Sequence, residues 1–327
     1  MDTPGVLVAA SYSQIKAQYP NEGRRRWKLR AVEEVWKASS IMEIEAKSEE
    51  IKKTQGVPAL PWLVDKDPLD LDDGPSEGRV VNAKGVIVRT DFSNDAAWDE
   101  FVSRVKEAEK EGVSGLTTGP GEEEGDGEEG EDSESSSDEE EEGDAQQMDV
   151  DPTGGGEGSA PRAEVPSVFH IINPAPTDPL RALVENASNI RLLRLFNDVQ
   201  IVPAPPKPRP PQGDLFSGMP KKKQQQPQPE KPPSNRLVDK FGWKEVYPGR
   251  ILWVFDAESN ATGGVRVVNS GDDSAYGSST GDSWRARAAH IWELQVNMDS
   301  GALKIDFGGE DRWTGKERLR NYEEGAR

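Results

Sequence analysis

Short patterned stretches of apolar residues alternate with long polar stretches along this chain of 327 residues. Residues 25–54 lack Pro and Gly, and apolar side chains such as Val32, Trp36 and Ile44 recur there at roughly helical spacing. This pattern predicts one long helix, because the surrounding Glu, Lys, Ala and Arg residues also favour helices. Gly56 and the prolines that follow it predict the end of that helix.

A strand followed by a helix is predicted over residues 85–110. Residues 85–90 are apolar and β-branched enough for a buried strand. After a tight turn at residues 90–92, we expect Ser93 to cap the helix. Its apolar side chains repeat at i, i+3, i+4 and i+7 and are Trp98, Phe101, Val102 and Val105.

A second strand and helix are predicted later in the chain. Residues 167–172 are typical of a strand. Asp178 is placed to cap a helix that starts at Pro179 and stops near Asn189. Residues 190–202 look extended.

The C-terminal part is predicted to be rich in strands. The continuous apolar run at residues 251–255 predicts a central strand with both faces covered, and residues 265–268 predict another. Alternating apolar residues on both sides of a turn at Asp299 predict a hairpin over residues 291–307. The charged residues 312–327 indicate a frayed helix or a tail.

Three polar stretches interrupt these elements. Residues 121–144 hold 15 Asp or Glu, four Ser and five Gly. We expect this tract and its flanks, residues 112–165, to be disordered. Prolines predict a stiff linker at residues 203–234, and Gly, Ser and Asp predict a long loop at 270–283.

The order of elements predicts an α+β or α/β fold: a small mixed sheet with helices packed on it, interrupted by disordered insertions, plus a long N-terminal helix. One interrupted domain is expected. Its parts are an N-terminal helical segment (1–56), an extended connector (57–84), a first strand and helix (85–111), the acidic insertion (112–165), a second part (166–202), the Pro-rich linker (203–234), a β-rich part (235–310) and a charged tail (311–327).

Composition excludes several classes of protein. The absence of Cys removes disulfides, thiolate metal sites and cysteine nucleophiles, and two His leave little for imidazole chemistry. We therefore expect no metal and no cofactor. The apolar runs reach only about five residues, against roughly 20 for a membrane span, and the first residues lack the features of a secretory signal. The expected compartment is intracellular, either nucleus or cytoplasm.

The net charge is −20, and residues 121–144 contribute 15 of those negative charges. The remainder of the protein is therefore only mildly acidic. Within the tract, acidic residues lie three positions after several serines, which is the spacing that an acidophilic kinase recognises. Such sites indicate a eukaryotic host. The candidate phosphorylation sites are Ser133, Ser135, Ser136 and Ser137.

The run Val86-Ile-Val-Arg-Thr-Asp-Phe-Ser-Asn-Asp-Ala-Ala-Trp98 resembles the opening of a family of small, mostly bacterial domains of unknown function. Those domains begin with Val-Arg-Thr-Asp-Phe-Ser-Asp-Asp-Ala-Ala-Trp, which corresponds here to residues 88–98. A fainter similarity lies at Trp292 and at Asn297, Met298 and Asp299. The resemblance implies a fold and brings no activity with it.

One group of residues is a candidate ligand groove. Arg89, Thr90, Asp91 and Asp95 fall at the end of a predicted strand and the start of a helix, where open α/β sheets bind ligands. Asp256 follows the predicted central strand, so it would complete a carboxylate cluster for a divalent cation if the chain brought them together. The alternative is structural, with the acidic residues capping the helix and pairing with Arg89.

Two basic clusters, residues 24–30 and 221–223, are candidates for nuclear import or nucleic-acid contact. Because phosphate backbones repel a chain of net charge −20, we do not expect direct nucleic-acid binding. The first cluster is equally suited to bind the protein's own acidic tract. Residues 205–211 are suited to proline-directed docking.

These features favour a non-enzymatic interaction module whose acidic arm engages basic partners, histone-like proteins included. Two alternatives stay open. One is a ligand-binding or metal-dependent enzyme domain with a groove near Asp91 and Asp256, and the other is a scaffold that docks through its Pro-rich linker.

Overall fold

The computed structural model describes residues 2–56, 59–70, 85–117, 167–207, 235–271, 277–305, 307 and 315–326. The chain divides into two units, one formed by residues 1–110 and 167–327 and the other by residues 111–166. We call the first unit the body. Of the second unit, the description covers only residues 111–117.

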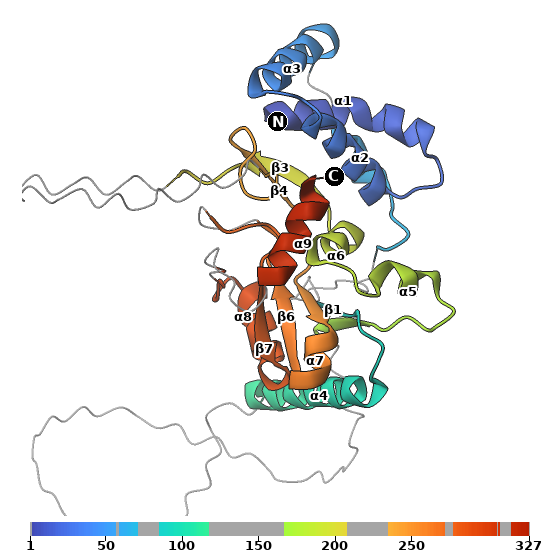
Figure 1. Ribbon diagram of the computed structural model, residues 1–327, viewed down its shortest axis with the longest axis vertical. Helices are drawn as coiled ribbons and strands as arrows, with labels where there is room; N and C mark the ends of the chain where they lie inside the picture. The colour runs from blue at the N-terminus through green and yellow to red at the C-terminus, as the bar shows by residue number, and fades with distance from the viewer. Residues whose placement is uncertain are drawn as a thin grey trace, which may run out of the picture. The chain divides into compact units, whose positions relative to one another are not determined.

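The body is built on a mixed sheet of five strands in the order β2-β1-β5-β6-β7 (Figure 1). The strands are β1 (Gly85–Arg89), β2 (Phe169–Ile172), β5 (Leu252–Phe255), β6 (Gly264–Val268) and β7 (Ser283–Arg287). β1 runs parallel to β2 and β5, whereas β6 and β7 extend the sheet in antiparallel fashion. The predicted α+β class is confirmed, and so is the central place of the apolar run at 251–255.

Alternate side chains of the strands enter two cores. Ile87, Trp253 and Phe255 point to the face covered by α4 (Asp95–Thr117) and α8 (Ile291–Asp299). Trp98 of α4 packs edge-on against Phe255, with ring centroids 5.1 Å apart. The side of α4 that covers this face is therefore the one predicted from the helical spacing of Trp98, Phe101 and Val105.

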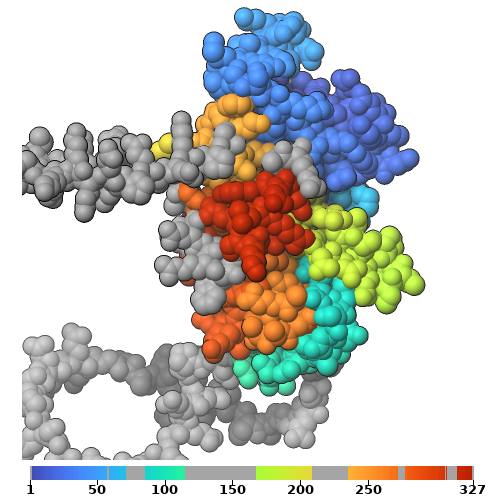
Figure 2. Space-filling view, in the orientation of Figure 1, coloured from blue at the N-terminus to red at the C-terminus, as the bar shows by residue number. Residues whose placement is uncertain are grey.

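The second core collects the remaining strand side chains, including Val88 and Val254. The elements around it are α5 (Pro179–Val184), α6 (Asn189–Phe196), the antiparallel pair β3 (Gln200–Pro203) and β4 (Trp243–Val246), and α9 (Gly315–Ala326). α9 lies on the surface beside α6 (Figure 2). The short α7 (Ala257–Thr262) and η2 (Ala288–His290) follow β5 and β7.

The N-terminal part consists of α1 (Thr3–Gln18), α2 (Arg24–Trp36), α3 (Ile41–Gln55) and the 3-10 turn η1 (Pro61–Val64). The single helix predicted over residues 25–54 is wrong, because the chain breaks between α2 and α3. Ser40 accepts a hydrogen bond from the Glu43 amide, and the Glu43 carboxylate accepts one from the Ser39 amide. This reciprocal capping starts a new helix where the apolar spacing alone showed none.

Two strand predictions in the second half are also wrong. Ile190 and Leu193 belong to α6, whose first amides are capped by Ser188. Only the end of the predicted extended stretch is a strand, β3. The hairpin expected at 291–307 is replaced by α8, in which Ile291 and Gln295, four residues apart, are both buried. Residues 292, 294 and 296 are only half-buried there, so their alternation did not mark a sheet face.

Three smaller differences concern element ends. Asn94, and not Ser93, caps α4, since its side chain accepts from the Ala97 amide at 3.1 Å. α4 continues through residues 112–117, part of the region expected to be disordered, because adding residues to an existing helix costs little.

β7 begins at Ser283, the last residue of the predicted loop at 270–283. Residues 315–326 form the helix α9, so the helical alternative for the C-terminus holds.

Candidate functional site

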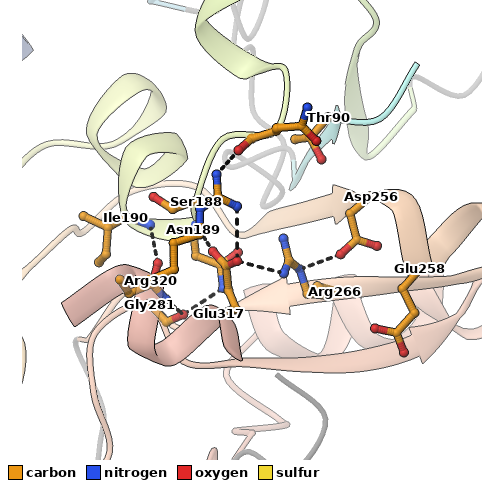
Figure 3. A network of polar contacts seen from close by, with 12 residues as sticks. Thr90, Ser188, Asn189, Ile190, Asp256, Glu258, Arg266, Gly281, Glu317 and Arg320 are labelled. Carbon is orange, nitrogen blue, oxygen red and sulfur yellow. Dashed lines mark hydrogen bonds and ion pairs between the residues drawn. The ribbon is translucent and has the colours of Figure 1, made fainter. Parts of the chain in front are cut away.

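The predicted groove residues lie at the carboxyl ends of two neighbouring parallel strands. The Thr90 amide, just after β1, donates to the Phe255 carbonyl of β5 at 2.8 Å. Asp256 is the next residue after Phe255, so the fold places Thr90 and Asp256 at one edge of the sheet (Figure 3). Their side chains, however, are directed at different partners.

Arg89 is buried and bound to its own loop. Its guanidinium donates to the Asp91 carbonyl at 2.9 Å and pairs with Asp95 at 2.7 Å. It also stacks over the rings of Phe92 and Trp98. The Asp91 carboxylate accepts from the Ser93 amide at 2.8 Å. These contacts match the structural alternative, in which Arg89 and the acidic residues stabilise the turn into α4.

The Asp256 carboxylate turns toward β6 and β7. It caps α7 through the Ser259 amide at 2.9 Å, and it pairs with Arg285 at 2.7 Å and Arg266 at 3.3 Å. Burial opposes ionisation of this carboxyl, but Arg266 and Arg285 outweigh it and hold its pKa below the ordinary value. Asp256 is therefore a charged structural group.

Arg266 connects Asp256 to the C-terminal helix. It lies 3.5 Å from the carboxylate of Glu317, the residue that also accepts the Asn189 amide at 2.7 Å (Figure 3). Glu317 thus places a negative charge at the N-terminus of α6, where backbone amides lack helical partners. The network joins β5, β6, α6 and α9 through charges that are nearly all buried.

This arrangement holds elements together and leaves few groups for chemistry. Among the residues that the structure describes, no cluster of three or more His, Asp or Glu side chains could hold a metal ion. Asp91 and Asp256 are each engaged with a different donor. The geometry therefore lends no support to a shared carboxylate site at this edge.

The lowered pKa of Asp256 makes stability depend on pH. Its contribution is present above the unfolded pKa of about 3.9 and is lost as the pH falls through the lower folded value. We expect Asp256→Asn, which keeps the capping oxygen, to lower the free energy of unfolding at pH 7 by about 1–2 kcal/mol. Urea unfolding from pH 7 to pH 2 should show this difference shrinking in acid.

A matched control is Glu100→Gln, which removes an exposed carboxylate paired with Arg104 on the surface of α4. Exposed pairs of this kind contribute at most about 0.5 kcal/mol. If the loss of unfolding free energy in Asp256→Asn stays constant between pH 7 and pH 2, the lowered pKa of Asp256 is contradicted.

The basic cluster at residues 24–30 is mostly used within the body. Four of its five cationic side chains have internal contacts: Arg24 pairs with Asp70 and Asp198, Arg25 with Asp67 and Asp70, Arg30 with Glu22, and Lys28 lies over the Trp62 ring. Only Arg26 is exposed and has no ion pair with another described residue. The cluster therefore offers little positive charge to a phosphate backbone.

Two residues on either side of the acidic insertion are joined within the body. The Glu109 carboxylate of α4 accepts a hydrogen bond from the Val168 amide at 2.6 Å, across 59 positions of sequence. The Val168 carbonyl in turn accepts from the Gly85 amide at the start of β1. The sheet and α4 are thus joined directly at the point where the chain leaves and returns.

Several predicted features lie outside the described residues. They are the acidic tract at 121–144 with Ser133, Ser135, Ser136 and Ser137, the basic cluster at 221–223 and most of the Pro-rich linker at 203–234. In the connector at 57–84 the structure describes residues 59–70, which include η1 and the paired Asp67 and Asp70.

Comparisons with protein-family models, with curated proteins and with solved structures find no match to this chain. The resemblance of residues 88–98 to a bacterial domain family therefore stays a prediction. In the described part of the chain, the helices are too short or too polar to pass through a lipid bilayer.

Proposed function

We propose that this protein is a non-enzymatic, intracellular interaction module whose acidic arm, residues 121–144, engages basic protein partners. Histone-like proteins are the class that such an arm fits best, because their Lys and Arg residues match its charge. The observation that carries the proposal is the contrast between the carboxylates of the body and those of the arm.

Many carboxylates of the body already have cationic partners. Asp65, Asp256 and Glu317 pair with Lys16, Arg285 and Arg266 respectively, and the fully buried Glu245 has two arginines around it. The arm concentrates 15 acidic residues in 24 positions that contain no Lys or Arg. Its charge therefore has no cation nearby in sequence and favours an external partner.

The body holds together the residues on either side of this arm, since the Glu109 carboxylate accepts a hydrogen bond from the Val168 amide. Each doubling of the length of an insertion adds only about 0.6 kcal/mol to the cost of closing it. Phosphorylation at Ser133, Ser135, Ser136 or Ser137 would add about −1.5 to −2 charges per site and strengthen attraction to the same partners.

The proposal is tested by binding of a purified histone to the full chain and to two variants. One variant lacks residues 121–144, and the other keeps their number but carries Gln for Glu and Asn for Asp. At low salt we expect both variants to bind at least about tenfold more weakly, because long-range attraction needs the charges. Binding by the full chain should also fall steeply as salt screens those charges.

The amide variant separates charge from length. If it binds the histone as well as the full chain does, the acidic arm is not the binding element. Binding that does not respond to salt would also oppose the proposal, since the Debye length shortens from about 10 Å at 0.1 M to about 3 Å at 1 M.

A further inference from the structure

A large cleft opens on the body between α2, the α5–α6 region and the segment at 235–240. Its volume is about 1220 Å³. Figure 2 shows two of the flanking blocks side by side, the N-terminal helices in blue and α5 and α6 in lime. Because ligand pockets for small molecules usually measure about 300–1,000 Å³, this cleft suits a ligand somewhat larger than a metabolite.

Cationic side chains reach this cleft from three separate segments. They are Arg26 of α2 and Lys37 just after it, Arg191 and Arg194 of α6, and Arg236 and Lys240 of the segment at 235–240. Arg26 and Arg191 are exposed and have no ion pair with any residue in the described ranges. The Lys240 ammonium donates to the uncharged Trp36 carbonyl at 2.8 Å. Lys37 pairs with Glu34, so the cationic side chains of the cleft without an ion pair in the described ranges are Arg26, Arg191 and Lys240.

The inner wall has an excess of arginine over carboxylate. Arg194 and Arg236 lie 3.6 Å and 3.4 Å from one buried carboxylate, Glu245, and Tyr247 beside it stays neutral because burial raises its pKa. These distances start from Arg194 Nη2 and Arg236 Nε, two buried atoms that pair with the carboxylate without hydrogen-bond geometry, so one carboxylate serves two arginines.

The carboxylates that also line the cleft are largely engaged elsewhere. Asp67 pairs with Arg25, Asp178 caps α5 through the Leu180 amide, and Glu324 accepts from the Ser188 hydroxyl. The remaining one is Glu33. Asp67 is thus paired with a cation, and Asp178 and Glu324 are held by hydrogen bonds within the body, whereas Arg26 and Arg191 have no ion pair in the described ranges.

Apolar side chains complete the lining. Leu180, Leu183 and Leu195 reach the cleft, and Leu183 is 41% exposed. A ligand with an anionic group beside an apolar one would bury this side chain and meet the arginines at once.

We infer that this cleft binds a phosphorylated segment of a partner protein, with the phosphate at the exposed Arg26 and Arg191 and a neighbouring apolar side chain on Leu183. Arginine is suited to this because its planar fork matches phosphate oxygens in bidentate geometry. The size of the cleft and its apolar wall favour a peptide over a small anion. This site is independent of the acidic arm, whose proposed partners are basic.

The test measures fluorescence anisotropy of the full chain with a labelled peptide that carries one phosphoserine between two leucines. We expect it to bind at least about tenfold more tightly than its unphosphorylated twin, and we expect inorganic phosphate to compete. The double variant Arg26→Glu with Arg191→Glu should weaken binding by about tenfold or more. Both side chains are exposed, so the variant is expected to fold, which circular dichroism verifies.

The control variant is Arg287→Glu, which reverses another exposed arginine without an ion pair in the described structure, on β7. It should bind the phosphopeptide within about twofold of the unmodified chain. The inference is overturned if the twin peptides bind equally, if the double variant binds as the unmodified chain does, or if the phosphopeptide does not bind. Loss of histone binding by the arm variants would leave this result unchanged, so the two proposals fail separately.

Discussion

Replacing Glu245 by Gln is expected to lower the free energy of unfolding by about 3–5 kcal/mol, because it leaves the buried Arg236 and the partly buried Arg194 without their carboxylate. Glu245 is fully buried in β4. Its carboxylate accepts hydrogen bonds from Trp36 Nε1 at 2.9 Å and from the Tyr247 hydroxyl, and Arg194 and Arg236 lie beside it. The same group therefore joins α2 to the sheet side of the body.

Urea denaturation followed by tryptophan fluorescence measures this loss. Trp36→Phe is the matched control, since it removes one hydrogen bond to Glu245 and keeps the charges, at an expected cost of about 1 kcal/mol. If Glu245→Gln costs no more than Trp36→Phe, the buried arginines do not depend on this carboxylate.

Replacing Arg266 by Met is expected to cost about 2–4 kcal/mol and to loosen α9 first. Arg266 is buried between Asp256 and Glu317, so its loss leaves Glu317 inside the body with the partly exposed Arg320 as its one cationic partner among the described residues. Because Glu317 holds the first amide of α6, both helices should open more often.

Hydrogen exchange of the full chain, read by mass spectrometry, measures this opening in α9 and α6. Arg320→Met is the control, because Arg320 is 42% exposed and its pairing with Glu317 is screened by water. Faster exchange in α9 is expected for the Arg266 variant only. Equal protection of α9 in both variants would contradict its dependence on Arg266.

The strands that could be predicted are those whose sequence excludes other structures. Residues 251–255 are continuously apolar and too short for a buried helix, so they could only be a covered strand. The helix after β1 was equally clear, because Trp98, Phe101 and Val105 repeat at helical spacing and all three are buried.

The elements that were missed depend on caps and on tertiary packing. The break between α2 and α3 follows from the Ser40 and Glu43 pair, a signal that was present in the sequence. Ser188 gave a similar signal before α6. For α8, the apolar residues fit both a period of two and a helical face, and the burial of Ile291 and Gln295 decided between them.

The sequence predicts that Thr90 and Asp256 each follow a strand. It predicts neither that these strands are neighbours nor where the two side chains point. Arg266 and Arg285 turn Asp256 away from Asp91, and both arginines come from strands whose pairing no local pattern reveals. The cleft was missed for the same reason. Arg191 and Arg236 are 45 positions apart in the sequence, and only the tertiary structure brings both to the lining of one cleft.

The order of pairing in the sheet has a consequence for synthesis of the chain. Val86 of β1 pairs with Leu252 of β5, so the two neighbours at the middle of the sheet are separated by 166 positions. Contacts between such distant residues form slowly. A ribosome must therefore translate beyond Phe255 before β1 gains its inner neighbour, and until then the edge of β1 that pairs with β5 has no strand beside it.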